Sequence, residues 1–166
     1  MELPAQRRDL KQARASFGEA ARLWTDDLPD AASVESRARA GLLDALSGKA
    51  AGRAAIEASL EQGQRMKRPS LEVLARVALA QLDVLRGQPQ QATAILAPVR
   101  LDAVGPELQA HVHHWRAAAA AAMGDDAAAE KERREVAQIL ALLRKSVPES
   151  LQPRFVLRPD VRALSQ

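Results

Sequence analysis

The fold is decided by residues 80–99 (AQLDVLRGQPQQATAILAPV) and residues 117–136 (AAAAAAMGDDAAAEKERREV), which share one pattern 37 residues apart. Each stretch has a small residue within an apolar segment, then a glycine, then an alanine, then a valine. These positions are Ala80, Gly87, Ala92 and Val99, and again Ala117, Gly124, Ala129 and Val136. Each copy predicts two helices joined by a glycine turn. Repeats with periods of about 20–50 residues are typical of stacked helical hairpins, in which each unit buries its apolar face against its neighbours.

Composition supports an all-α domain of ordinary size. The chain has 166 residues, of which 47% are hydrophobic and only 2% aromatic. The apolar content is mostly Ala, Leu and Val, so strand signals are few and helices can approach closely. The absence of cysteine excludes disulfides, thiolate metal sites and a Cys nucleophile.

Apolar periodicity and turn residues predict seven helices. They are expected over residues 5–24, 30–46, 51–66, 70–86, 89–99, 106–123 and 126–145. We expect residues 1–146 to form the helical repeat domain and residues 147–166 to form a capping tail. The last long helix carries six consecutive charged residues, 130–135, which we interpret as a solvated face with ion pairs such as Glu130 with Arg134.

The helix–glycine–helix units resemble tetratricopeptide repeats, in which small residues occupy these same offsets. Gly41, Gly48 and Ala54 fit a third copy if one residue is inserted in the turn. The resemblance covers about residues 8–145 and implies a right-handed α-solenoid. Residues 8–24 are similar to the second helix of a repeat. They indicate either the C-terminal part of a longer array or an N-terminal cap.

The tail is similar to an ending that follows such repeats in large bacterial signalling proteins. The pattern is carried by Val147-Pro148, Phe155-Val156-Leu157 and Pro159-Asp160-Val161-Arg162-Ala163-Leu164. A solenoid protein stays soluble only if the apolar surface at its open end is covered. We therefore expect Phe155, Leu157, Val161 and Leu164 to cover the apolar end of the last hairpin.

The resemblance also implies a binding groove, because the first helix of each tetratricopeptide pair lines the concave face. The expected groove residues are Glu35, Ala38, Leu42, Leu74, Val77, Gln81, His111, His114 and Ala118. Most of these side chains are apolar or small, and the chain contains no Asn with which to clamp a peptide carboxylate. We therefore expect an apolar or helical protein segment as the ligand, from a partner protein or from an adjacent domain of a longer parent chain.

A second interpretation concerns the histidines, which all fall in residues 111–114. On a helix, Glu107, His111 and His114 share one face at spacings of four and three, as a metal or small-molecule site would require. The alternative is a polar stretch beside a groove with no metal bound, and we expect no cofactor.

The function expected from these patterns is a non-catalytic interaction or scaffolding module in bacterial signalling. The serines lie in no nucleophile motif and no phosphate-binding loop is present, so we expect no enzyme. Net charge is only +3 and the charges are interspersed, which does not favour nucleic acid. We also expect no membrane contact and a cytoplasmic location. A homodimer formed through the N-terminal helix is the third alternative.

Overall fold

A computed structural model describes residues 12, 15–16 and 31–164 of the chain. Every regular element in these residues is helical, which confirms the all-α class. The first expected helix, residues 5–24, lies outside the described residues except for Gln12, Ala15 and Ser16, which are helical. The proposed dimer contact through that helix also lies outside them. Within the described part, no helix has both the length and the apolar character needed to cross a membrane.

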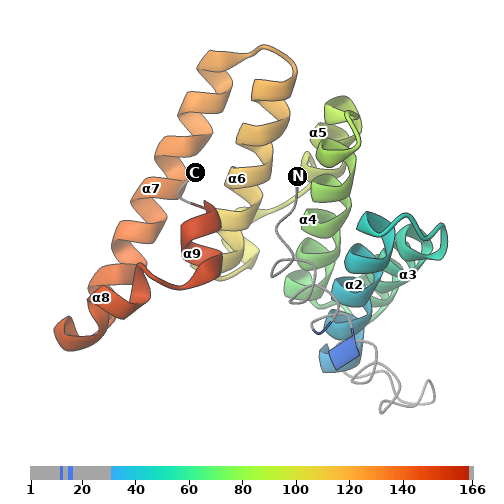
Figure 1. The fold of residues 1–166 in the computed structure, drawn as a ribbon, viewed down its shortest axis with the longest axis horizontal. Helices are drawn as coiled ribbons and strands as arrows, with labels where there is room; N and C mark the ends of the chain where they lie inside the picture. Colours follow the sequence, from blue (N-terminus) through green and yellow to red (C-terminus); the bar gives the residue numbers. More distant parts are fainter. Residues whose placement is uncertain (1–11, 13–14, 17–30, 165–166) are drawn as a thin grey trace. The chain divides into compact units, whose positions relative to one another are not determined.

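The long helices begin and end close to their expected bounds. They are α2 (Ala31–Leu46), α3 (Ala51–Arg65), α4 (Pro69–Leu85), α5 (Pro89–Leu96), α6 (Pro106–Ala122) and α7 (Asp126–Ser146). Each end lies within one residue of its expected position, apart from the end of α5. Figure 1 shows these helices following one another along the chain.

The expectation for α5 was wrong at its end: the helix stops at Leu96 rather than Val99. Pro98 has no N–H to donate to the carbonyl of Ala94, so the hydrogen-bond ladder cannot continue through it. A short 3-10 helix, η1 (Leu101–Ala103), follows instead.

The tail contains three short elements that the sequence did not indicate. They are the 3-10 helix η2 (Glu149–Leu151), α8 (Gln152–Phe155) and α9 (Pro159–Leu164). Phe155, Val161 and Leu164 are buried, as expected of a cover. The expectation for Leu157 was wrong, because it is 66% exposed in the bend between α8 and α9.

Three helix turns use glycine in a backbone conformation that other residues rarely adopt. Gly48, Gly87 and Gly124 have φ of 83°, 72° and 80°. Their positions after α2, α4 and α6 match the turn glycines of the repeat pattern. The turn between α3 and α4 has no such glycine, and Lys67 takes the same region there with φ of 52°.

The chain divides into two compact units, Met1–Leu82 and Asp83–Gln166. In the first unit, α2 and α3 pack closely because glycines face each other across the hairpin. A Cβ added at Gly41 would lie 2.8 Å from the carbonyl oxygen of Gly52. Val34, Ala38 and Ile56 are at most 1% exposed in this unit's core.

In the second unit, α6 and α7 form a long hairpin that carries α9 (Figure 1). Its helices approach through small side chains, since Ala119 and Ala129 are both fully buried. The carboxylate of Asp125 accepts a 2.9 Å hydrogen bond from the backbone N–H of Ala128 and caps α7. This hairpin positions the candidate site.

Candidate functional site

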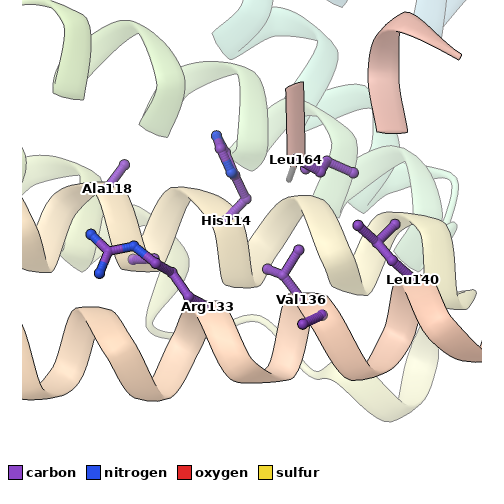
Figure 2. Close-up of a pocket in the computed structure, with 8 residues that line it drawn as sticks. His114, Ala118, Arg133, Val136, Leu140 and Leu164 are labelled. Carbon is purple, nitrogen blue, oxygen red and sulfur yellow. The ribbon is translucent and has the colours of Figure 1, made fainter. Parts of the chain in front are cut away.

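A cavity of about 320 Å³ lies on the α6–α7 hairpin beside α9, and we call it the hairpin cavity. Eight residues line it: His114, Ala117 and Ala118 from α6, Arg133, Val136, Ala137 and Leu140 from α7, and Leu164 from α9. Figure 2 shows Leu164 beside His114, with Ala118 and Arg133 further along the hairpin. Six of the eight side chains are apolar, so the cavity is suited to an apolar group.

The wall near α9 is a small buried cluster. Ala110 of α6, Val136 of α7 and Leu164 of α9 are 0%, 4% and 8% exposed, and Ile139 and Leu140 pack against them. Val136 and Leu140 are four residues apart, so they lie on the same face of α7. Alanines on α6 leave room above that face, and the cavity occupies this space.

Two polar side chains reach the cavity, and only one is charged at neutral pH. Burial lowers the pKa of His114 from its ordinary value of 6.5, and the backbone of Leu164 opposes this shift. The imidazole is therefore neutral at pH 7, and its ring lies edge-on to Trp115 with centroids 5.0 Å apart. Arg133 supplies the positive charge, with one guanidinium nitrogen 3.8 Å from a carboxylate oxygen of Glu130.

A side-chain pair holds the two helices in register next to the cavity. Nδ1 of His113 lies 2.6 Å from Oε2 of Glu132, and the two side chains are only 11% and 22% exposed. These residues precede His114 and Arg133 directly. The pair therefore fixes the rotation of both helices where they line the cavity.

The contact expected between Glu130 and Arg134 is confirmed at 3.1 Å. The interpretation of residues 130–135 as a wholly solvated face was wrong for Glu132, since the partner of its carboxylate belongs to another helix. Sequence spacing within one helix could not reveal that partner.

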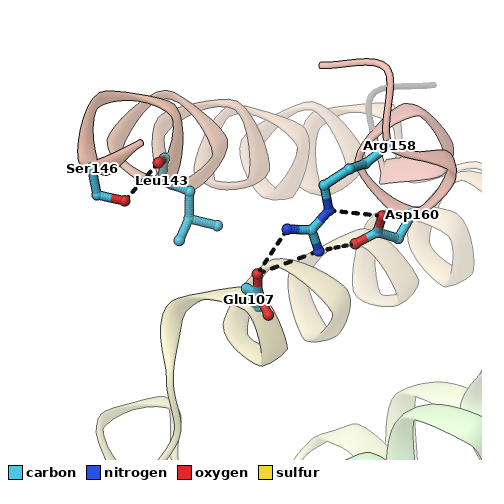
Figure 3. A network of polar contacts seen from close by, with 5 residues as sticks. All are labelled: Glu107, Leu143, Ser146, Arg158 and Asp160. Carbon is cyan, nitrogen blue, oxygen red and sulfur yellow. Dashed lines mark hydrogen bonds and ion pairs between the residues drawn. The ribbon is translucent and has the colours of Figure 1, made fainter. Parts of the chain in front are cut away.

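The segment before α9 is attached to α6 by polar contacts (Figure 3). Arg158 lies 3.5 Å from Oε1 of Glu107 and 2.6 Å from Oδ2 of Asp160. Its guanidinium also lies over the Phe155 ring, 5.6 Å from the centroid. The hydrogen bond from Arg158 lowers the pKa of Asp160, so this carboxylate is charged at neutral pH.

The expected groove residues fall into the two units. Glu35, Ala38, Leu42, Leu74, Val77 and Gln81 belong to the first unit, and His111, His114 and Ala118 to the second. His114 and Ala118 line the hairpin cavity together, whereas His111 does not. In the first unit, Ala38 and Val77 are 0% and 8% exposed, so they offer almost no surface to a ligand.

The carboxylate of Glu35 forms an ion pair with Arg39 of the same helix, with Oε1 of Glu35 2.7 Å from a guanidinium nitrogen. Leu42, Leu74 and Gln81 are half-buried.

The proposed metal triad is not assembled in the described residues. No group of three or more His, Asp or Glu side chains in this part of the chain could hold a metal ion. Glu107 faces Arg158 instead, so its carboxylate has a different partner.

Sequence reasoning missed the contribution of α7 and α9 to the cavity. Arg133, Val136, Ala137, Leu140 and Leu164 were not among the expected site residues. The i, i+4 spacing of Val136 and Leu140 was a usable signal, but it indicates a buried stripe as readily as a site. The position of Leu164 depends on how the tail folds back.

No protein-family model, curated protein or solved structure matches this chain.

Proposed function

We propose that this chain is a non-catalytic protein-interaction module of tetratricopeptide-like kind, which binds an apolar helical segment of a partner at the hairpin cavity. One observation carries the proposal: an apolar cavity between two antiparallel helices continues from the place where a short helix of the same chain, α9, is already docked. The site therefore has the surface chemistry that accepts a helix.

The size of the cavity favours side chains of a peptide over a whole small molecule. Sites for small ligands usually measure about 300–1,000 Å³ and bury most of the ligand. At about 320 Å³, the hairpin cavity lies at the lower limit of that range and is partly open to solvent. It accommodates the apolar side chains of one helical turn, as in helix-in-groove recognition.

The lining supports the same type of ligand. Ala117, Ala118 and Ala137 make a shallow bed on which a helix can lie closely, while Val136 and Leu140 supply apolar contact. Arg133 at the rim is half exposed and can meet a carboxylate on the bound segment. The site thus combines an apolar bed with one cation.

A peptide library tests the proposal. Random peptides displayed on phage are selected against the intact chain, and the selected peptides are expected to be amphipathic helices. Replacing Ala137 with Glu puts a charge in the cavity and is expected to weaken their binding at least tenfold in fluorescence anisotropy.

The matched control is Ala127→Glu, the same change at an exposed position of α7 that does not line the cavity. It is expected to leave affinity unchanged. Selected peptides that bind Ala137→Glu as tightly as the unaltered chain show that the cavity is not the site.

A further inference from the structure

We infer that α9 is an internal occupant of the partner site, and that a partner helix with apolar residues at i, i+3 and i+7 binds by displacing it. The inference rests on the proposed function and adds regulation and a ligand pattern to it. α9 lies on the hairpin through a few contacts, and the cavity lining continues past Leu164 to Ala118 and Arg133.

The position of α9 aligns it with the cavity. Arg158, directly before α9, lies against Glu107 in the first turn of α6. Leu164, at the other end of α9, packs with Ala110 and Val136 and lines the cavity with His114. The helix therefore follows α6 from its first turn toward its middle, and the cavity continues along the same line.

The cavity lining extends about one turn past the residues that Leu164 contacts. Ala118 is four residues after His114 on α6, and Arg133 is three residues before Val136 on α7, so both lie about one turn beyond the Leu164 contact. A helix that takes the place of α9 and is one turn longer fills both surfaces. The first two apolar residues of this longer helix have the three-residue spacing of Val161 and Leu164. The third follows four residues later, which gives the pattern i, i+3 and i+7.

The attachment of α9 is weak enough to be replaced. The helix α9 has six residues, fewer than an isolated helix needs to be stable in water. Two of its apolar side chains, Val161 and Leu164, are buried at 6% and 8% exposed, and the backbone of Leu164 also contacts His114. The ion pair between Arg158 and Glu107 is 45% and 63% exposed, and such surface pairs contribute little.

A longer partner helix makes contacts beyond those of the six residues of α9. Its third apolar side chain enters the hairpin cavity, and a carboxylate near that turn faces Arg133. α9 belongs to the same chain as the hairpin, so its effective concentration at the site is in the millimolar range. Occupancy of the site by α9 therefore lowers the apparent affinity for a partner by the fraction of time the site is free.

A designed peptide tests this competition. The probe is residues 157–164 of this chain followed by four residues, the last a leucine seven positions after Val161, labelled with fluorescein. It is measured by anisotropy against the full chain and against the full chain carrying both Val161→Asp and Leu164→Asp, which releases α9. If α9 is docked at least ten times as often as it is free, the released chain binds the probe at least tenfold more tightly.

The control is Leu157→Asp, the same type of change in the same segment at a side chain that is 66% exposed. It is expected to bind the probe like the unaltered chain. Equal affinities of the released and unaltered chains overturn the inference, provided that circular dichroism shows the released chain to lose no more helix than the six residues of α9.

Hydrogen exchange gives a second readout that needs no variant. Saturating the unaltered chain with the probe is expected to speed exchange of the amides of α9 as it leaves the hairpin. If the probe binds and these amides stay as slow as before, α9 is not displaced, while the proposed function stands. If Ala137→Glu leaves probe binding unchanged in the released chain, the hairpin cavity is not the site and the proposed function fails.

Discussion

Replacing Gly52 with alanine tests the close approach of α2 and α3. A Cβ at this position would lie 2.5 Å from the carbonyl oxygen of Gly41 and 2.7 Å from Cα of Ala45, and it would also meet the nitrogen of Ala45. All three are backbone atoms, so no side-chain rotation can relieve the contact. The two helices must separate or shift for the methyl group to fit.

The magnitude follows from two opposing effects. Alanine in place of glycine within a helix stabilises it by up to about 1 kcal/mol. Overpacking in a tight core costs about 1–3 kcal/mol, and contact with rigid backbone belongs at the upper end. We expect a net loss of about 2 kcal/mol in the free energy of unfolding. With an m-value of about 2 kcal/mol/M, the urea midpoint falls by about 1 M.

The assay is urea unfolding followed by far-UV circular dichroism, with Gly105→Ala as the control. Gly105 has no heavy atom within 4 Å of an added Cβ and a φ of −69°, so alanine fits there without strain. Its unfolding free energy is expected to change by no more than about 0.5 kcal/mol. A Gly52→Ala chain as stable as the unaltered one would refute the close contact between α2 and α3.

Three further predictions concern the second unit. Replacing His113 with Phe removes the partner of the largely buried Glu132 carboxylate and is expected to cost about 1–3 kcal/mol in urea unfolding, whereas no loss would mean that the pair does not form. Replacing Asp125 with Ala removes the cap of α7 and is expected to cost about 1 kcal/mol; an unchanged thermal midpoint would contradict the cap geometry. Burial holds the pKa of His114 below 6.5 in the folded chain, so the unfolded chain binds more protons and stability is expected to fall as the pH drops from about 7 through 6.5 toward the lower folded pKa. Comparison with His114→Gln isolates this effect from other titrating groups, because a parallel pH profile in that variant would show that His114 contributes nothing to it.

The helices and turns of this protein were predictable because their causes are local. The positive φ of Gly48, Gly87 and Gly124 follows from the need for a left-handed residue after a helix, and each is marked in the sequence by glycine itself. The cap at Asp125 is similarly a contact over three residues. The end of α5 could also have been predicted from the sequence, because Pro98 has no N–H with which to continue the helical hydrogen bonds.

The site was predictable only in part. His114 and Ala118 were expected at a groove and do line the hairpin cavity, because both lie on a helix whose period could be followed. Arg133 was assigned to a solvated face, since its sequence neighbours are all charged. Its place at the cavity depends on the rotation of α7 against α6, which the contact between His113 and Glu132 holds.

By itself, then, the sequence determined an all-α chain, the bounds of its long helices apart from the end of α5, and its glycine turns, since these arise from contacts within a few residues. The tertiary structure decided which faces meet. The contacts of Gly41 with Gly52, of His113 with Glu132 and of Leu164 with Ala110 each join two different helices. Such pairings depend on the packing of whole helices, and no local periodicity specifies the partner of a buried face.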